Sequence, residues 1–416
     1  MAEKSNELCK MTKKITVPQI RFKEFSDLPA GKAEEWEEKK LNELTTMHAR
    51  IGWQNLRTSE FLDSGDYMLI TGTDFNDGSI NYSTCHYVEK ERYDQDKNIQ
   101  IHNGSILITK DGTLGKVAYV QGLSMPATLN AGVFNVEIKD KNATDEKYLF
   151  QYLKAPFLMD YVSKKATGGT IKHLNQSILV DFPVVIPSLS EQQKIGSYFR
   201  QLDRLITLYQ RKYNKLTSVK KSMLQKMFPA SGQTVPALRF AGFTDKWEVR
   251  KVKEVCSIST GKSNTQDHVE NGKYPFYVRS PIIERSNRYL FDEEAVLTVG
   301  DGVGTGKVFH YVNGKYDLHQ RVYRMFDFSD DITAKYFFYY FSNHFYDRVM
   351  AMTAKTSVDS VRYEMIADMD IAMPIVSEQK LIANYFRQLD HLIALHQQEL
   401  QKLQNLKKAC LKKMFV

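Results

Sequence analysis

A stretch of 39 residues occurs twice in this chain and limits the folds that the chain can adopt. Residues 190–228 and 377–415 align without a gap at a constant offset of 187 positions, with 22 identities. The hexapeptide at 198–203 is repeated unchanged at 385–390. Because a repeat of this kind marks equivalent structural units, the fold must contain two copies of one element.

Both copies have the periodicity of a long amphipathic helix. With Ile195 and Ile382 at heptad position a, apolar residues recur at a, d and e, a broader stripe than a bare coiled-coil seam. At 1.5 Å per residue each helix would be roughly 55 Å long, far above the usual length. Ser190 and Ser377 are predicted N-caps, each followed by an acid. We predict that the helices pack on each other; two unrelated surface helices are the alternative.

A polar layer interrupts the predicted a/d seam near its middle. Tyr209 and Lys212 occupy positions a and d of the first helix, and His396 and Glu399 occupy the same positions of the second. Antiparallel pairing about the midpoint would place Tyr209 against Glu399 and Lys212 against His396. A slipped register would bury unpaired charge, so these four residues are predicted to fix the register.

Composition indicates a globular protein with a basic helical part. A chain of 416 residues holds two or three domains, and its four cysteines are scattered singly, which favours a reducing cytoplasm. The net charge is +8, and the two repeated segments (190–229 and 377–416) carry +7 and +4, so the remaining residues sum to −3. This balance indicates a polyanion or an acidic protein as partner, although a solvated helix face explains it as well.

A second motif shows that the repeat is larger than the helix. Residues 17–22 (Val-Pro-Gln-Ile-Arg-Phe) return at 235–240 as Val-Pro-Ala-Leu-Arg-Phe, and each copy opens a unit. The predicted parts are therefore a flexible tail (1–16), a first body (17–187), a first helix (188–229), a linker (230–234), a second body (235–375) and a second helix (376–416).

The two bodies agree in outline. Strand-like runs at 105–109 and 116–120, and at 295–299 and 307–312, flank glycine-rich turns. Residues 145–163 and 332–350 are helical and aromatic, and strand-like runs at 181–186 and 370–375 lead into the long helices. We therefore predict α+β bodies of antiparallel sheet with a few helices.

No catalytic or metal constellation emerges from the sequence. The glycine-rich runs before Lys116 and Lys307 fail the phosphate-loop pattern twice each, because Gly is missing five positions before Gly-Lys and valine follows the lysine. Single histidines such as His48, His86 and His319 are interpreted as structural. No run of apolar residues is long enough to indicate a membrane span.

The opening motif, the Ser-Glu-Gln helix starts at 190–192 and 377–379 and the Lys-Met-Phe ends at 226–228 and 413–415, each present twice, resemble the specificity subunits of type I restriction-modification systems. The resemblance covers nearly the whole chain. It implies two target-recognition domains that each read half of a bipartite DNA site, and an antiparallel helix pair (a coiled coil) that sets the spacing and docks methyltransferase subunits. Stretches 50–54, 70–75 and 109–112 resemble one type of recognition domain, and 261–262 with 277–281 another.

The resemblance also implies what this chain does not carry. It would be a non-catalytic, cytoplasmic DNA-recognition subunit, with S-adenosylmethionine, ATP and Mg²⁺ bound by partner subunits. Those partners would be two methyltransferase and two restriction-translocase subunits, together with double-stranded DNA. The alternatives are a coiled-coil adaptor without a DNA role and a fused restriction-methylation enzyme, which would need a methyltransferase motif.

Polar and basic residues near the turns of each body are the candidate DNA contacts. In the first body they are Arg50, Trp53, Gln54, Lys110, Lys116, Lys164, Lys165, Thr170, Lys172 and His173. In the second they are Lys262, Asn264, Arg279, Arg285, Arg288, Lys307, Arg321, Lys355 and Arg362.

Overall fold

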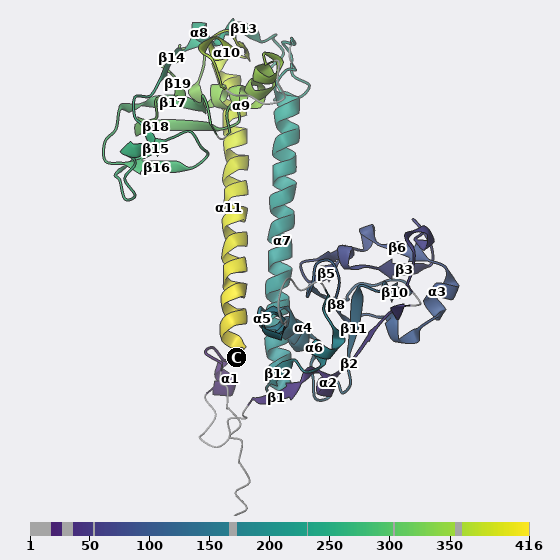
Figure 1. Ribbon diagram of the computed structural model, residues 1–416. Helices are drawn as coiled ribbons and strands as arrows, with labels where there is room; N and C mark the ends of the chain where they lie inside the picture. Colours follow the sequence, from purple (N-terminus) through teal and green to yellow (C-terminus); the bar gives the residue numbers. More distant parts are fainter. Residues whose placement is uncertain are drawn as a thin grey trace, which may run out of the picture. The chain divides into compact units, whose positions relative to one another are not determined.

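The computed structural model describes residues 18–26, 36–52, 55–165, 173–230, 232–302, 304–353 and 360–415. The predicted tail, 1–16, lies outside these residues. The chain forms two compact units, Met1–Leu208 with Glu399–Val416, and Tyr209–Gln398. Both boundaries fall inside the long helices, so each unit contains one α+β body and a part of each helix (Figure 1).

The two repeated segments form the predicted long helices, α7 (Leu189–Met227) and α11 (Val376–Met414), of 39 residues each. They run antiparallel in each unit. In the first unit Lys407 pairs with Asp203, and in the second Lys220 pairs with Asp390. The predicted N-caps were wrong, because Ser190 and Ser377 lie inside the first helical turn.

The seam between the helices follows heptad positions a and e, so the prediction that a and d form it was wrong. One set of buried and half-buried positions in α7 recurs in alternating steps of four and three, and α11 repeats the set 187 positions later. They are Ile195, Phe199, Leu202, Ile206, Tyr209, Tyr213, Leu216, Lys220, Met223 and Met227. This spacing has the 3.5-residue period of coiled-coil packing, but the predicted d positions Leu205 and Lys212 are exposed.

The predicted polar layer is therefore not assembled as expected. The ring of Tyr209 lies 5.6 Å from that of His396, in place of Glu399. Lys212 is exposed, with its Nζ 5.6 Å from the centre of the Tyr209 ring. Glu399 forms an ion pair with Lys402 of its own helix. The charged residues within the seam are Lys220 and Lys407, which pair with aspartates.

The first body contains two four-stranded sheets. One has the order β6-β3-β10-β7, and the other has the order β2-β11-β8-β9. Their strands are β2 (Thr45–Ala49), β3 (Tyr67–Ile70), β6 (His86–Val88), β7 (Gln100–Ile101), β8 (Ile106–Thr109), β9 (Val117–Tyr119), β10 (Ala127–Leu129) and β11 (Val133–Ile138). A small hairpin joins β4 (Phe75–Asn76) to β5 (Ser79–Ile80). The helices are α1 (Lys23–Ser26), α2 (Leu41–Leu44), α3 (Lys90–Asp94), α4 (Glu146–Lys154), α5 (Phe157–Lys165) and α6 (Gln176–Val180).

The second body contains one six-stranded sheet in the order β14-β19-β17-β18-β15-β16. Its strands are β14 (Ser257–Thr260), β15 (Tyr274–Tyr277), β16 (Ile283–Ser286), β17 (Phe291–Val299), β18 (Phe309–Leu318) and β19 (Val322–Phe326). The helices are α8 (Val252–Val255), α9 (Ala334–Ala351) and α10 (Tyr363–Ala367). The predicted hairpins and aromatic helices are confirmed, but the sheets are not purely antiparallel, because β3–β10 and β15–β18 pair in parallel.

A short antiparallel ladder leads the chain from each body into its long helix. β12 (Pro183–Ile186) pairs with β1 (Glu37–Lys40), and β20 (Asp370–Met373) pairs with β13 (Glu248–Lys251). The glutamine of the following Ser-Glu-Gln then binds the start of the body's helix. Gln192 accepts a hydrogen bond from the Asp145 N–H (2.9 Å), and Gln379 accepts one from the Thr333 N–H (2.8 Å).

The opening motifs clamp the ends of the long helices. Arg21 donates two hydrogen bonds to the buried carboxylate of Glu191, and Arg239 does the same to Glu378. The Ile20 N–H donates to the last turn of α11 at the Lys413 carbonyl (2.9 Å), and the Leu238 N–H donates to the Lys226 carbonyl of α7 (2.8 Å). The acidic residue of Ser-Glu-Gln therefore holds an arginine, in addition to its favourable place in the first turn.

The Lys-Met-Phe ends close the aromatic cores. Phe415 stacks on Phe199 with ring centres 5.5 Å apart, and Phe228 stacks on Phe386 at 5.7 Å. All four rings are at most 2% exposed, so each repeat buries the end of one long helix against the start of the other. In the described part of the chain, no helix is both long and apolar enough to cross a bilayer.

Candidate nucleic-acid interface

In the first α+β body (17–187), called the first domain from here on, several candidate DNA contacts lie at the glycine-rich loop between β8 and β9. The Lys110 carbonyl accepts a hydrogen bond from the Leu174 N–H (2.9 Å), and Asp111 lies 2.6 Å from the His173 ring. The loop is thus tied to the chain that follows residues 166–172. The structure brings the predicted Lys110, Lys116 and His173 to one place, with Lys116 and His173 exposed.

Gly115 allows this loop to lie against α5. Its φ is +71°, a conformation that favours glycine, and an added Cβ would lie 2.1 Å from the Met159 sulfur. Lys164 and Lys165 are exposed at the end of the same helix. Lysines therefore occur both on the loop and on the helix that it contacts.

The second domain repeats this arrangement with other side chains. The Gly300 carbonyl, at the start of the β17–β18 loop, accepts a hydrogen bond from the Val361 N–H (2.7 Å), as Lys110 does from Leu174. Asp301 of this loop lies 3.4 Å from Arg279 and 3.7 Å from Arg321. Two arginines on one carboxylate leave a positive charge, which suits contacts with phosphate.

A polar pocket of about 380 Å³ opens beside these arginines. Every residue that lines it is polar: Asn264, Thr265, Gln266, Arg279, Asp301, His319, Gln320 and Arg321. His319 is buried, and its Nδ1 accepts a hydrogen bond from the Arg321 N–H (3.0 Å). Burial lowers the pKa of His319, so the ring is neutral near pH 7 and presents no charge to the pocket.

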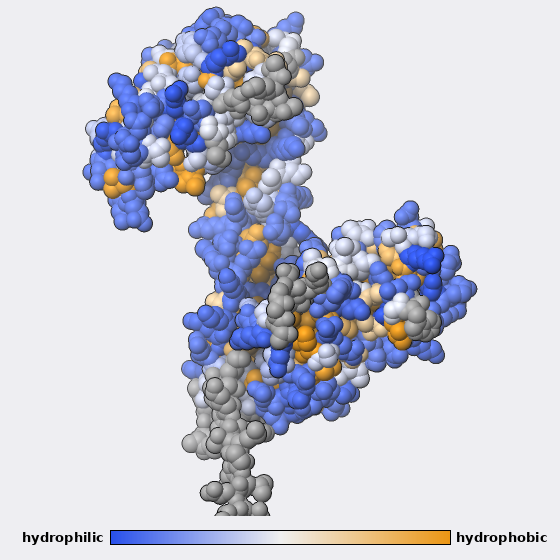
Figure 2. Space-filling model, in the orientation of Figure 1, coloured by the Kyte–Doolittle hydropathy of each residue, from blue (hydrophilic) through white to orange (hydrophobic). Residues whose placement is uncertain are grey.

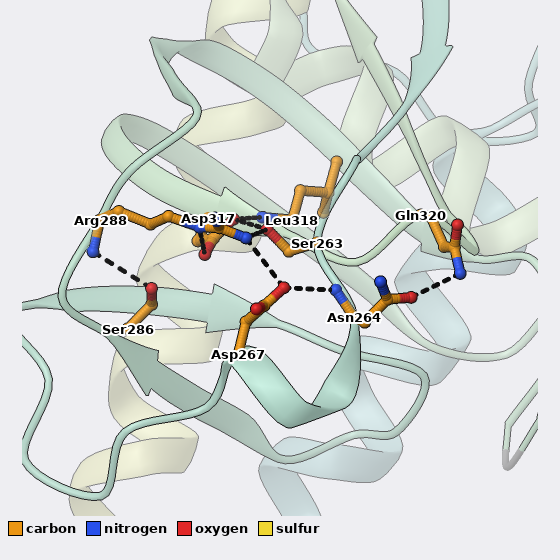
Figure 3. Close-up of polar contacts among 8 residues, drawn as sticks. All are labelled: Ser263, Asn264, Asp267, Ser286, Arg288, Asp317, Leu318 and Gln320. Carbon is orange, nitrogen blue, oxygen red and sulfur yellow. Dashed lines mark hydrogen bonds and ion pairs between the residues drawn. The ribbon is translucent and has the colours of Figure 1, made fainter.

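One wall of the pocket rests on a polar network built around the buried Asp317 and Ser263 (Figure 3). Asp317, with no exposed surface, accepts hydrogen bonds from the Ser263 hydroxyl and the Leu318 N–H. Arg288 donates to Ser263 (3.1 Å) and Asp267 (2.8 Å). Its Nε lies 3.6 Å from Asp317.

Some predicted contacts have structural roles instead. Arg50 is only 1% exposed and donates hydrogen bonds to the Leu129 carbonyl and Thr128, so its burial argues against a DNA contact. Arg285 donates to the Gly272 and Lys273 carbonyls and thereby holds a turn. Arg288 belongs to the network described above.

The remaining candidates are exposed or lie outside the described residues. Lys262, Asn264 and Arg362 are exposed, and so is Lys307, which lies 4.4 Å from the centre of the Tyr346 ring. Trp53, Gln54, Thr170, Lys172 and Lys355 lie outside the described residues. DNA contact remains a prediction for each exposed candidate.

Sequence reasoning missed Thr265, Gln266, Asp301 and Gln320, which line the pocket together with His319, the histidine that was interpreted as structural. They follow no spacing pattern, and the pocket brings together residues up to 57 positions apart in the chain, from Asn264 to Arg321. The one available signal was the short polar run 319–321, from which only Arg321 was chosen. Among the described residues, no group of His, Cys, Asp or Glu is placed to hold a metal ion.

Comparison with known proteins agrees with this architecture. The family described as type I restriction modification DNA specificity domain matches residues 33–218 and 244–405, one segment for each repeat. The type I restriction enzyme MjaVIII specificity subunit of Methanocaldococcus jannaschii is 23% identical, over 90% of this chain and 94% of its own. A putative type I restriction enzyme MjaX specificity subunit from the same organism is 21% identical, over 92% and 93%.

A solved structure shows the same fold. The crystal structure of the S subunit of a type I restriction-modification system from M. genitalium superposes with a TM-score of 0.69, over 96% of this chain and 99% of its own, at 14% identity. The chain therefore belongs to the type I restriction-modification DNA specificity family. It is a specificity subunit with two target-recognition domains, one in each repeat.

Proposed function

We propose that each target-recognition domain reads one half of a bipartite duplex site and that the helix pair fixes the distance between the halves. The observation that carries the proposal is the repeated loop arrangement, in which Lys110 and Gly300 hold equivalent hydrogen bonds but different polar side chains surround them. Equal scaffolds with unequal side chains suit two readers of different sequence. A helix of 39 residues spans about 58 Å, compared with about 34 Å for one turn of DNA.

Exchange of one domain tests this proposal. Residues 37–187 are replaced by those of another specificity subunit, and the methylated sites of a genome that carries the hybrid complex are mapped. We expect one half-site to change while the other half-site and the spacer stay the same. If both half-sites change together, the two-reader proposal is wrong.

We further propose that methyltransferase subunits dock on an exposed leucine surface of the long helices. Leu205 and Leu208 of α7 are 41% and 45% exposed, and their equivalents Leu392 and Leu395 of α11 are each 42% exposed. Figure 2 shows hydrophobic patches along the helices. Repeated leucines on the outer side of a coiled coil favour a further helix as partner.

The two leucine pairs allow separate tests. Leu205→Asp with Leu208→Asp is expected to remove one methyltransferase subunit from the complex, and Leu392→Asp with Leu395→Asp the other, as measured by the mass of the assembly in light scattering. Asn214→Asp, at another exposed position of α7, is the control. A full assembly in both leucine variants would refute this docking surface.

We infer that the chain is a non-catalytic cytoplasmic subunit and that S-adenosylmethionine, ATP and Mg²⁺ bind to its partners. Support for the reducing compartment comes from Cys85, Cys256 and Cys410, which are buried free thiols. Two restriction-translocase subunits would join the same assembly. Tight binding of either cofactor to the purified chain, measured by titration calorimetry, would contradict this inference.

A further inference from the structure

Two loops of the second domain are joined so closely that the side chains at their ends are fixed. The Lys262 and Ser263 N–H groups both donate to the Leu318 carbonyl (3.1 and 3.0 Å), and the Gln320 N–H donates back to the Ser263 carbonyl (2.9 Å). A Cβ on Gly261 would lie 2.0 Å from the Leu318 carbonyl oxygen, so the approach requires glycine. Asn264 and Gln320 therefore extend from a rigid junction.

The polar network beneath this junction explains its rigidity. A buried carboxylate such as that of Asp317 is costly unless it is paired and hydrogen-bonded. Asp317 holds the Ser263 hydroxyl and faces Arg288, while Asp267 accepts hydrogen bonds from Arg288 and from the Asn264 N–H (both 2.8 Å). Arg288 thus connects Asp317, which accepts a hydrogen bond from Ser263, with Asp267, which accepts one from the Asn264 N–H.

The exposed ends of the junction form an amide pair (Figure 3). The Gln320 side chain donates to the Asn264 side-chain oxygen at 2.6 Å. This bond leaves the Asn264 amide group as a free donor and the Gln320 oxygen as a free acceptor. If both amides were turned over, one donor and one acceptor would still be free, so the result does not depend on the assignment.

An adjacent donor and acceptor complement the edge of one base. In the major groove adenine presents the N7 acceptor beside the N6 donor, which Asn and Gln side chains recognise with two hydrogen bonds. Guanine presents two acceptors, N7 and O6, which favour arginine or lysine. Arg279 and Arg321 line the same pocket, and guanidinium groups beside such a base suit contacts with its backbone phosphates.

We propose that the Asn264–Gln320 pair reads an adenine in the half-site of the second domain, and that Arg288 is a positioning residue that acts through Asn264. The proposal rests on the proposed function, since it assumes that the second domain reads DNA. It assigns base recognition to two amides and removes Arg288 from the direct contacts.

Selection from a random duplex library tests the assignment. The complex of the chain with its methyltransferase subunit is incubated with the library, and bound duplexes are sequenced for the wild type, Asn264→Ala, Gln320→Ala, Arg288→Ala and the control Asn271→Ala. Asn271 is an exposed asparagine of the same domain that does not line the pocket. Both amides are exposed, so their variants are expected to fold normally.

We expect the wild type to prefer adenine at one position of the second half-site by about 10- to 100-fold over other bases. Asn264→Ala and Gln320→Ala should lose this preference at that position alone, and Asn271→Ala should keep it. Arg288→Ala should weaken the same position, and in the Asn264→Ala background it should have no further effect on base preference. A purely structural role of Arg288 would instead weaken every position of the half-site.

The outcomes separate this inference from the proposed function. A wild-type complex that selects no bipartite sequence would refute the proposed function itself. A wild-type complex that selects one, together with amide variants that select the same sequence equally well, would refute the inference alone. If the amide variants lose a preference for guanine, and the preference for adenine is unchanged, the base assignment is wrong.

Discussion

The two ion pairs in the helix seam, Lys407–Asp203 and Lys220–Asp390, occupy equivalent positions of the repeat but differ in burial. We therefore predict that replacing each aspartate by alanine lowers the free energy of unfolding by different amounts. The Lys407 side chain is 9% exposed and that of its partner Asp203 is 32% exposed, whereas Lys220 and Asp390 are 27% and 38% exposed. Burial lowers the pKa of Lys407, which also lies near Lys154. Asp203→Ala therefore leaves a desolvated ammonium group without its paired carboxylate.

The exposed fractions of the paired side chains set the expected loss in the free energy of unfolding. Breaking a buried pair by removing one partner costs about 3–5 kcal/mol, an upper bound here because water reaches part of Asp203. Gln151, which donates to Asp203 (2.7 Å), loses an acceptor as well. Asp390→Ala breaks a partly exposed pair worth about 0.2–1 kcal/mol, and removes the hydrogen bond from the Tyr339 hydroxyl (2.8 Å), worth about 1 kcal/mol. The expected difference in the free energy of unfolding is about 2 kcal/mol.

Urea unfolding followed by the helical circular dichroism signal measures this difference. Both variants exchange aspartate for alanine within a long helix, so the change in helix propensity cancels between them. In the Asp203→Ala background, Lys407→Met should restore stability because it removes the orphaned charge. Equal destabilisation by the two alanine variants, or failure of Lys407→Met to restore stability, would refute the reasoning from burial.

Three further predictions concern other charged groups. Lys212→Leu with Glu399→Leu should change the melting temperature by at most a few degrees and leave the preferred DNA spacer intact, because Lys212 is exposed and Glu399 is paired with Lys402 of its own helix; a shift in spacer preference, measured with sites one base pair longer, would restore the polar-layer hypothesis. Arg239→Ala should cost about 3–5 kcal/mol in urea unfolding, since Glu378 is buried and loses its partner, and Arg239→Lys should recover only part of this stability. Burial lowers the pKa of His319 below 6.5, so on acidification the unfolded chain takes up a proton before the folded chain does. The free energy of unfolding should therefore fall as the pH drops below about 6.5, and this group should have no effect above that pH. A pH series with His319→Gln, which should remove this part of the slope, checks the sign.

The repeat made the helical part of the fold predictable, but not its seam. The constant offset of 187 residues predicted two equivalent long helices, and their antiparallel pairing is seen in each unit. Positions d and e both carry apolar residues, such as Leu205 and Ile206, and periodicity alone cannot tell which row meets the partner. The charge of Lys212 at a d position does not distinguish the rows either, because the seam itself carries Lys220.

The candidate site was predictable only where composition marks a loop. The glycine-rich turn with Lys110 and Lys116 was found because glycine and lysine are recognisable locally. Arg50 was predicted as a DNA contact, but it is hydrogen-bonded inside the first domain, where arginine is rare and no local pattern marks it. Gln320 escaped notice because its significance comes from Asn264, 56 positions away, and no local pattern records such a pair.

The opening motifs have a consequence for how the fold depends on chain connectivity. The Leu238 N–H donates a hydrogen bond to the end of α7, the helix that directly precedes this motif in the chain. The Ile20 N–H donates the equivalent hydrogen bond to the end of α11, which comes nearly 400 residues later. The contact is thus the same whether or not a peptide link supports it. The two repeats therefore follow one another in a cyclic order, in which neither repeat is structurally first. We expect a circular permutant that joins the end of α11 to the first opening motif, and is opened between α7 and the second opening motif, to keep the contacts of both motifs.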